Sequence, residues 1–284
     1  MLEVFEIFKW PFLACLILTG IHCYLGLHIV SRGVIFVDLS LAQMAAFGSS
    51  LALLFDCELG SSTSYFMGLA FTFVGAAIFS LSRMRDERVP QEAIIGIVYA
   101  VASAATILIL SQAHHGFEKI KSMLDGGILY VDGHGVLKIF IIYAVIGLFH
   151  FIFRKQFLLI STNLSAARAS GMKIRLWDFL FYMTFGFVVT SSVQIAGVLM
   201  VFSYLVIPAV CAILFTDKIL PRLLIGWGIG TLASAIGLLA SYYVTIGETQ
   251  GLPSGSAVVT TFGIVLILAA LLRLAVKKSK GTNG

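Results

Sequence analysis

Charged side chains are scarce in this chain of 284 residues. Asp, Glu, Lys and Arg together make up only 12% of the sequence, whereas hydrophobic residues make up 59%. Soluble domains carry about 25% charged residues, which cover their surfaces. The scarcity of charge therefore excludes a soluble enzyme, and the high apolar content excludes a disordered chain. The composition predicts a protein that crosses a membrane several times.

Cysteine pairs and catalytic motifs are also lacking. The four cysteines form no C-x-x-C pair, so neither a disulfide scaffold nor a zinc motif is indicated. The chain has no Walker A or Walker B motif, and it lacks G-x-S-x-G and H-E-x-x-H. We therefore expect no catalytic residues, and ATP hydrolysis, if it drives the protein, is expected in a separate subunit. The first apolar stretch lacks the basic flank of a signal peptide and is expected to remain as a helix.

Long apolar runs are plentiful. A membrane-spanning helix needs about 20 mostly apolar residues. The sequence has nine such stretches, without the alternation of apolar and polar residues that indicates a membrane barrel. We predict an all-α polytopic membrane protein with about nine transmembrane helices in one domain, 1–284, and the least distinct separation falls at Thr190-Ser191-Ser192. The predicted spans are 8–30, 34–55, 63–82, 91–111, 135–153, 176–192, 194–215, 220–244 and 256–276.

The basic residues are distributed unequally between the two faces. With nine crossings, 15 of the 19 Lys and Arg residues lie at one face. They are Arg32, the basic residues of three connections, and those of the C-terminal segment with its basic tail, 277–284. Basic residues favour the cytoplasmic side, so the N-terminus is predicted outside and the C-terminus inside. The net charge of +5 is thus assigned to topology and to contact with membrane lipid, and no nucleic-acid partner is expected. The three connections are 83–90, 154–175 and 216–222.

The longest outer connection, 112–134, offers two candidate metal ligands, His114 and His115. A solvated loop is the alternative. Within this connection, residues 120–131 are expected to form a short helix that dips into the bilayer around Asp125-Gly126-Gly127. Non-helical backbone at that depth has to line a protein cavity.

Three histidines lie inside predicted membrane helices: His22, His28 and His150. An ionisable residue within the membrane is a candidate functional residue, so each is a candidate for a transport pathway. The alternative is a hydrogen bond to a neighbouring helix. His22 and His28 are six residues apart and do not face the same way.

Proline and small residues mark the last third of the chain. Pro208 lies near the cytoplasmic end of the 194–215 stretch, removes a backbone hydrogen bond and is expected to kink the helix. A kink there suits a moving gate, and a purely structural bend is the alternative. The stretch 220–244 carries small residues at four-residue spacing, which favour close helix packing, within one chain or between two. They are Gly226, Gly230, Ser234, Gly237 and Ser241.

Four short stretches, in order along the chain, together resemble one family. Residues 91–98 (QEAIIGIV) resemble the E-A-x-I-G-I segment of ABC-type metal permeases, and residues 167–171 (ARASG) resemble their A-R-A-x-G coupling segment. Residues 194–199 (QIAGVL) followed by 205–209 (LVIPA) resemble their Q-x-x-G-x-L…L-V-I-P-A run. Residues 31–48 occupy the place of their metal motif. The chain is similar to the permease subunit of zinc, manganese or iron ABC importers.

This resemblance implies a fold and a set of partners. The fold is the all-helical importer class shared with iron-siderophore and cobalamin permeases. Two copies of the chain would enclose one pathway in the bacterial inner membrane, an ATP-binding cassette subunit would drive it, and an extracytoplasmic metal-binding protein would deliver the ion. A divalent metal would be the substrate, and no cofactor held by the chain is implied. A stand-alone carrier or channel, which is expected to show inverted halves, and an ABC permease for a non-metal substrate are the alternatives.

The resemblance also suggests residues that face the ATPase. Ala167, Arg168 and Gly171 match the coupling segment, within a cytoplasmic stretch of about 160–175 that is expected to form a short helix ended by Gly171. Glu92 starts a helix on the same side, where it either caps that helix or contributes to a gate. Pro208 is the other candidate for this gate.

The chain departs from the family at the metal motif. Aligned on Gly48, Leu39 stands where the family has Asp, and Gln43 stands where it has His. Asp38 and Gln43 are five residues apart, about 140° around a helix, and do not share a face unless the helix starts after Asp38. Ser40 and Gln43 do share a face. Asp38, Ser40 and Gln43 are the pathway candidates on this helix, and a mostly weakly ligating path is expected.

Overall fold

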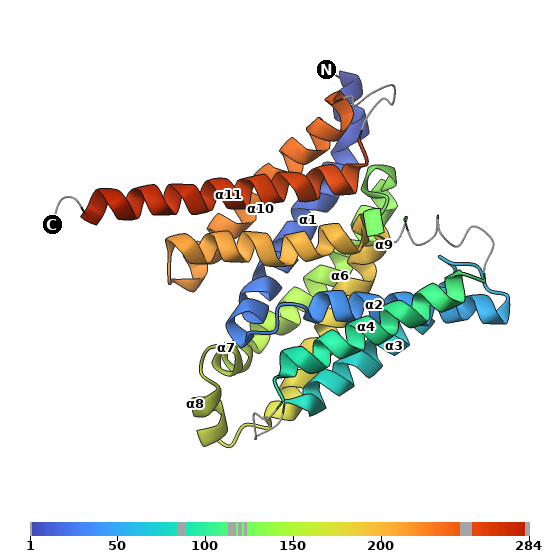
Figure 1. Ribbon diagram of the computed structural model, residues 1–284, viewed down its shortest axis with the longest axis horizontal. Helices are drawn as coiled ribbons and strands as arrows, with labels where there is room; N and C mark the ends of the chain where they lie inside the picture. Colours follow the sequence, from blue (N-terminus) through green and yellow to red (C-terminus); the bar gives the residue numbers. More distant parts are fainter. Residues whose placement is uncertain are drawn as a thin grey trace.

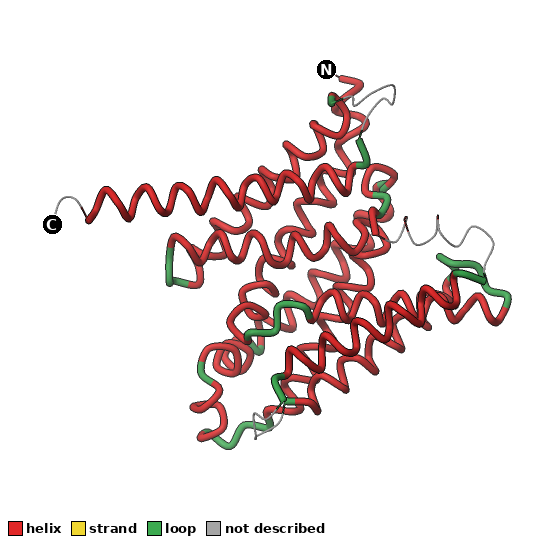
Figure 2. The backbone as a smooth tube through the Cα atoms, viewed as in Figure 1, coloured by secondary structure: helices red, strands yellow, loops and turns green. Residues whose placement is uncertain are grey.

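A computed structural model describes residues 2–83, 89–112, 118, 121, 124–244 and 252–281 of the chain. These residues form helices and no strand (Figure 2), as the composition predicts. The α-helices are α1 (Leu2–Arg32), α2 (Val37–Leu51), α3 (Ser62–Ser82), α4 (Gln91–Leu110), α6 (Gly133–Ile152), α7 (Arg154–Thr162), α8 (Leu164–Ala169), α9 (Ile174–Phe215), α10 (Ile219–Tyr243) and α11 (Ser254–Gly281), and two short 3₁₀ helices are η1 (Ala52–Phe55) and η2 (Ile128–Tyr130).

Eight helices in the described part of the chain are long and apolar enough to cross a membrane. One of them, α9, has 42 residues and contains two of the expected spans, 176–192 and 194–215. At about 1.5 Å per residue a straight helix of this length would measure about 63 Å, twice the hydrocarbon thickness of a bilayer. Instead, Figure 1 shows its second half turning back across the molecule. The two halves agree with nine crossings; that count and the side of each terminus remain predictions.

The break in α9 lies at Gly197, whose φ of 76° and ψ of 163° leave the helical region. The expected separation at Thr190-Ser191-Ser192 is wrong, because these residues lie inside the helix and their region is buried. The hydroxyls of Ser191 and Ser192 donate to the carbonyls of Phe187 and Val188, so they satisfy themselves within the helix. Glycine adopts a positive φ without steric cost, which explains why the break falls at Gly197.

The connection before α6 packs into this break. The N–H of Gly127 donates to the carbonyl of Ile195 at 3.0 Å, and a Cβ on Gly126 would overlap the backbone of Ala196 and Gly197. Asp125 accepts a hydrogen bond of 2.6 Å from Ser256 at the start of α11. In the described part of the expected 120–131 helix, residues 121, 124 and 125 are helical and η2 follows them, and Gly126, Gly127 and Tyr130 line a cavity described below.

Two groups of helices pack against a centre formed by α1 and the first half of α9, which α6 also contacts (Figure 1). The first group is α2, α3 and α4, and the second is the second half of α9 with α10 and α11. The small residues of α10 pack within the chain: Gly226 faces Cys23 and Pro208, and Gly230 faces Thr19. Pro208 is thus a packing contact of α10, and the helix break lies at Gly197 rather than at this proline.

A short helical excursion, α7 and α8, lies at one end of the bundle, opposite the N-terminus (Figure 1). The side chain of Asn163 accepts a 2.9 Å hydrogen bond from the N–H of Ala166 and caps the start of α8. The chain leaves α8 through Gly171, which has a φ of 73°. The short helix expected in the 160–175 stretch is therefore present, with both ends closed by local interactions.

Candidate functional site

The first turns of α2 contain buried polar atoms without partners. Asp38 is 1% exposed and Ser40 is 0% exposed. Neither carboxylate oxygen of Asp38, nor the Ser40 hydroxyl, has a hydrogen-bond partner among the described residues. Gln43 is half-buried, one turn beyond Ser40. Since buried polar groups are normally hydrogen-bonded, the unpartnered oxygens of Asp38 and Ser40 make these two residues candidate ligands of a cation.

A cavity of about 740 Å³ lies along the following turns of α2. Its walls combine small residues, hydroxyls and one amide with Leu59, Tyr130 and Val193, and none of its lining residues is His, Cys, Asp or Glu. The sequence analysis assigned no site role to the serine and threonine residues of this wall, because they resemble ordinary packing residues of a membrane helix. The lining includes Ala45, Ala46 and Ser49 of α2, Ser64 of α3, Gly126 and Gly127, and Thr190 and Gln194 of α9.

His22 is enclosed in a hydrogen-bonded network away from this cavity. It is 0% exposed, and its ring nitrogens lie 2.8 Å from the carbonyl of Leu18 and 3.3 Å from the hydroxyl of Ser192. Ser192 also lies 2.5 Å from the Tyr143 hydroxyl. Both nitrogens thus have partners, so the geometry favours the alternative considered for His22, a hydrogen bond to neighbouring helices.

His28 and His150 are likewise occupied. His28 hydrogen bonds with Ser161 of α7 at 2.8 Å, and His150 bonds with Thr184 at 2.8 Å and Tyr24 at 3.3 Å. Among the described residues, no three His, Cys, Asp or Glu side chains gather closely enough to hold a metal ion. The candidates His114 and His115 lie outside the described residues.

Glu92 caps a helix, but not its own. The N-cap of α4 is Pro90, and no side chain caps it. Instead, one Glu92 oxygen accepts the N–H of Phe36, the N-cap residue of α2, at 3.1 Å. Its other oxygen is buried without a partner in the described part of the chain. Glu92 therefore ties the starts of α2 and α4 together.

A second cavity, of about 330 Å³, adjoins Glu92 and α8. Its lining includes Arg32, Arg83 and Arg168 in addition to Glu92. Arg168 and Gly171 are exposed, whereas Ala167 is fully buried. The coupling candidates therefore present a polar face outward from α8 and anchor it with one apolar side chain.

An ionic cluster behind α8 was missed by the sequence analysis. Asp178, fully buried in α9, accepts hydrogen bonds from Arg32 of α1 at 2.8 Å and from Arg83 at 2.8 and 2.9 Å. We call Arg32, Arg83 and Asp178 the Asp178 cluster. A signal for it was present, because Asp178 is an acidic residue within an apolar span and such residues need partners.

Comparison with protein families accounts for nearly the whole chain. The model of the ABC 3 transport family matches residues 4–273. The chain belongs to the ABC 3 transport family. It is a multi-pass protein of the bacterial plasma membrane, and the family expected from the four sequence motifs is confirmed.

Individual relatives and a solved structure agree with this assignment. The manganese transport system membrane protein MntC of Listeria innocua is 28% identical over 219 residues, which cover 75% of each chain. The chelated iron transport system membrane protein YfeC of Yersinia pestis is 28% identical over 187 residues, which cover 66% of this chain and 63% of that one. The structure of PsaBC from Streptococcus pneumoniae in complex with Fab has the same fold, with a TM-score of 0.76 at 20% identity over 94% of this chain and 92% of that chain.

Proposed function

We propose that this ABC 3 family chain is the permease subunit of an importer for a divalent transition metal, driven by a separate ATPase subunit. The observation that carries the proposal is the family match over almost the whole chain, with relatives named for manganese and iron transport. The donor atoms on α2 support it. They are carboxylate, hydroxyl and amide oxygens, which suit Mn²⁺, whereas Zn²⁺ and Fe²⁺ more often take sulfur or imidazole ligands.

The metal pathway in this proposal runs along α2, from Asp38 to Gly48, with Gln43 nearest the ion. Two observations support this placement: the unpartnered oxygens of Asp38 and Ser40, and the cavity beside Ala45, Ala46 and Ser49. A pathway has to release its ion as readily as it binds it, so few and weak ligands suit it. Leu39 and Gln43, in place of the family's Asp and His, fit such a pathway.

The partners in this proposal are an ATPase at α8, a metal-binding protein at the outer connections and a second copy of the chain. The ATPase contact is supported by three features of α8: it lies at the end of the bundle, is capped at both ends and exposes Arg168. A closed two-fold dimer is the commonest symmetric assembly. ATP hydrolysis is assigned to the ATPase because the chain lacks nucleotide-binding motifs.

Cellular metal content tests the proposal ion by ion. Manganese, iron and zinc are measured in cells that lack the gene for this chain and in cells complemented with the parent chain or with Gly171→Ile. The proposal predicts a loss of manganese or iron, restored by the parent but not by the variant. If no metal changes in the cells that lack the gene, the substrate assignment is wrong.

A further inference from the structure

One arginine holds both ends of the segment that contains α8. Arg32 is the last residue of α1, and its side chain is 1% exposed. Its Nε donates to the Ser161 hydroxyl at 2.9 Å, and its Nη1 donates to Asp178 at 2.8 Å. Ser161 lies near the end of α7, just before α8, and Asp178 lies in the second turn of α9, which follows α8, so a single guanidinium bridges the incoming and outgoing stretches of this excursion.

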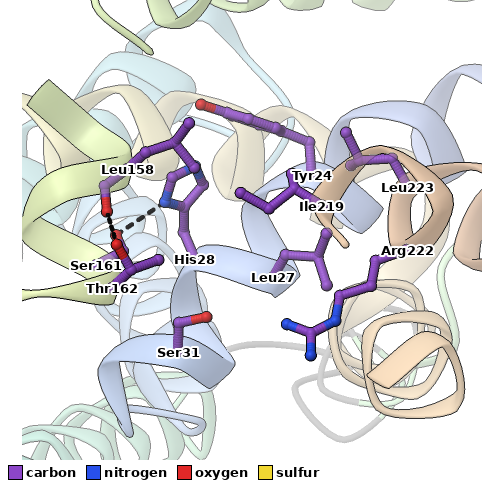
Figure 3. Close-up of a pocket in the computed structure, with 10 residues that line it drawn as sticks. All are labelled: Tyr24, Leu27, His28, Ser31, Leu158, Ser161, Thr162, Ile219, Arg222 and Leu223. Atoms are coloured by element: carbon purple, nitrogen blue, oxygen red, sulfur yellow. Dashed lines mark hydrogen bonds between the residues drawn. The ribbon is translucent and has the colours of Figure 1, made fainter. Parts of the chain in front are cut away.

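Further contacts fix the orientation of the Arg32 guanidinium. Its central carbon lies 3.9 Å from the centre of the Phe181 ring, a cation–π contact. His28 shares the Ser161 hydroxyl, and Figure 3 shows its ring pointing at Ser161 across the α1–α7 contact. Arg83, at the end of α3, reaches the same carboxylate of Asp178. Helices α1, α3, α7 and α9 therefore meet at the base of α8.

The excursion between these two attachment points has little freedom of its own. Asn163 caps α8 at its start, and after its end the N–H groups of Gly171 and Met172 donate to carbonyls of Arg168 and Ala167. The side chain of Ala167, within α8, is fully buried. A force applied to α8 is thus transmitted to Ser161 and Asp178, and through both to Arg32.

We propose that Arg32 is a positioning residue for coupling: it makes α8, the end of α1 and the start of α9 move as one body when the ATPase moves α8. The proposal rests on the function proposed above. Arginine suits the role because its planar fork donates in two directions at once and also stacks on an aromatic ring. A lysine ammonium at the same place keeps the charge but cannot reproduce this planar geometry.

The rigid-body prediction is tested by spin labels on Ser31→Cys and Ser165→Cys, two exposed positions on α1 and α8. Cys57 is replaced by serine, because it is the one cysteine of the chain that is not buried. In the assembled complex the distance between these labels is expected to stay the same with and without ATP. A single label at Ser165→Cys, which reports the separation of the two α8 helices in the dimer, is expected to change.

Transport assays on Arg32 variants give the second readout, the number of ATP molecules hydrolysed per ion transported. Arg32→Ala is expected to raise this ratio about tenfold, within the range that coupling between sites spans, and Arg32→Lys by less. Arg222→Ala is the matched control, because Arg222 is another largely buried arginine, and its partners, Thr216 and Asp217, lie in its own connection. Its ratio is expected to stay at the parent value.

The outcomes separate the inference from the proposed function. A parent complex that transports but whose Ser31–Ser165 distance changes with ATP overturns the inference and leaves the function standing. A folded Arg32→Ala variant that hydrolyses as many ATP molecules per ion transported as the parent also overturns the inference and leaves the function standing. If the parent chain does not associate with an ATPase, the proposed function fails, and the inference with it. If Arg32→Ala does not fold, the parent distances and the ratio of Arg32→Lys decide, and a parent ratio in Arg32→Lys overturns the inference.

Discussion

The N–H of Gly127 donates to the carbonyl of Ile195 across 3.0 Å, directly beside the break in α9 at Gly197. The connection before α6 therefore supplies a hydrogen bond at the point where α9 leaves the helical conformation. The first half of α9 joins this break to Asp178 and α8. One continuous helix thus links the connection before α6 to Asp178, near the proposed ATPase contact.

The close approach at this break predicts that Gly126→Ala and Gly197→Ala destabilise the protein. Both residues have a positive φ, and an added Cβ would overlap the facing backbone. Strain of this kind costs about 1–3 kcal/mol per residue. The apparent melting temperature of the detergent-solubilised protein is expected to fall for each variant. Gly96→Ala is the control, since nothing lies within 4 Å of a Cβ there, and an equal fall in all three would contradict the account.

The Asp178 cluster predicts a strong effect of Asp178→Leu on stability. The substitution leaves Arg32 and Arg83 without their shared carboxylate in a buried site. Removing one member of a buried ion pair costs about 3–5 kcal/mol. The matched control is Asp217→Leu. The carboxylate of Asp217 is exposed and pairs with Arg222, and a surface ion pair contributes about 0–1 kcal/mol. Thermal unfolding of both variants checks this, and similar losses at the two sites would show that the cluster is not stabilising.

Gly171 is predicted to tolerate only residues that accept a positive φ. Its φ is 73°, so Gly171→Ile strains the turn after α8 and is expected to prevent assembly with the ATPase or to uncouple it. Gly171→Asn is expected to assemble, because asparagine is the next most common residue in this helix-ending conformation. Co-purification with the ATPase, followed by transport, distinguishes the two. Normal assembly and transport by Gly171→Ile would remove the coupling assignment from this turn.

Restoring the family's metal motif is predicted to trap the ion. Leu39→Asp combined with Gln43→His places two ligands about 40° apart on one face of α2. Such a pair should bind Zn²⁺ more tightly and release it more slowly than the parent. Bound zinc and metal uptake rate are measured in the double variant and the parent. Unchanged values for both would mean that this face of α2 does not meet the ion.

The sequence predicted the helices well because membrane spans depend on the length of an apolar run, which is a local property. The break at Gly197 was not predicted, because a glycine in an apolar run looks like a packing residue until the facing Gly126 is known. The Asp178 cluster was missed for a related reason: its partners lie 146 and 95 positions away in the sequence. The polar Thr190-Ser191-Ser192 stretch suggested a loop, but serine hydroxyls can bond back to their own helix.

Metal uptake into proteoliposomes tests the central claim most directly. Vesicles contain the purified chain either alone or with its partner ATPase subunit, and the partner binding protein loaded with manganese or iron is supplied on the outer side. The account predicts uptake only when the ATPase and ATP are present. Equal uptake by the chain alone would show a stand-alone carrier or channel and would contradict the account.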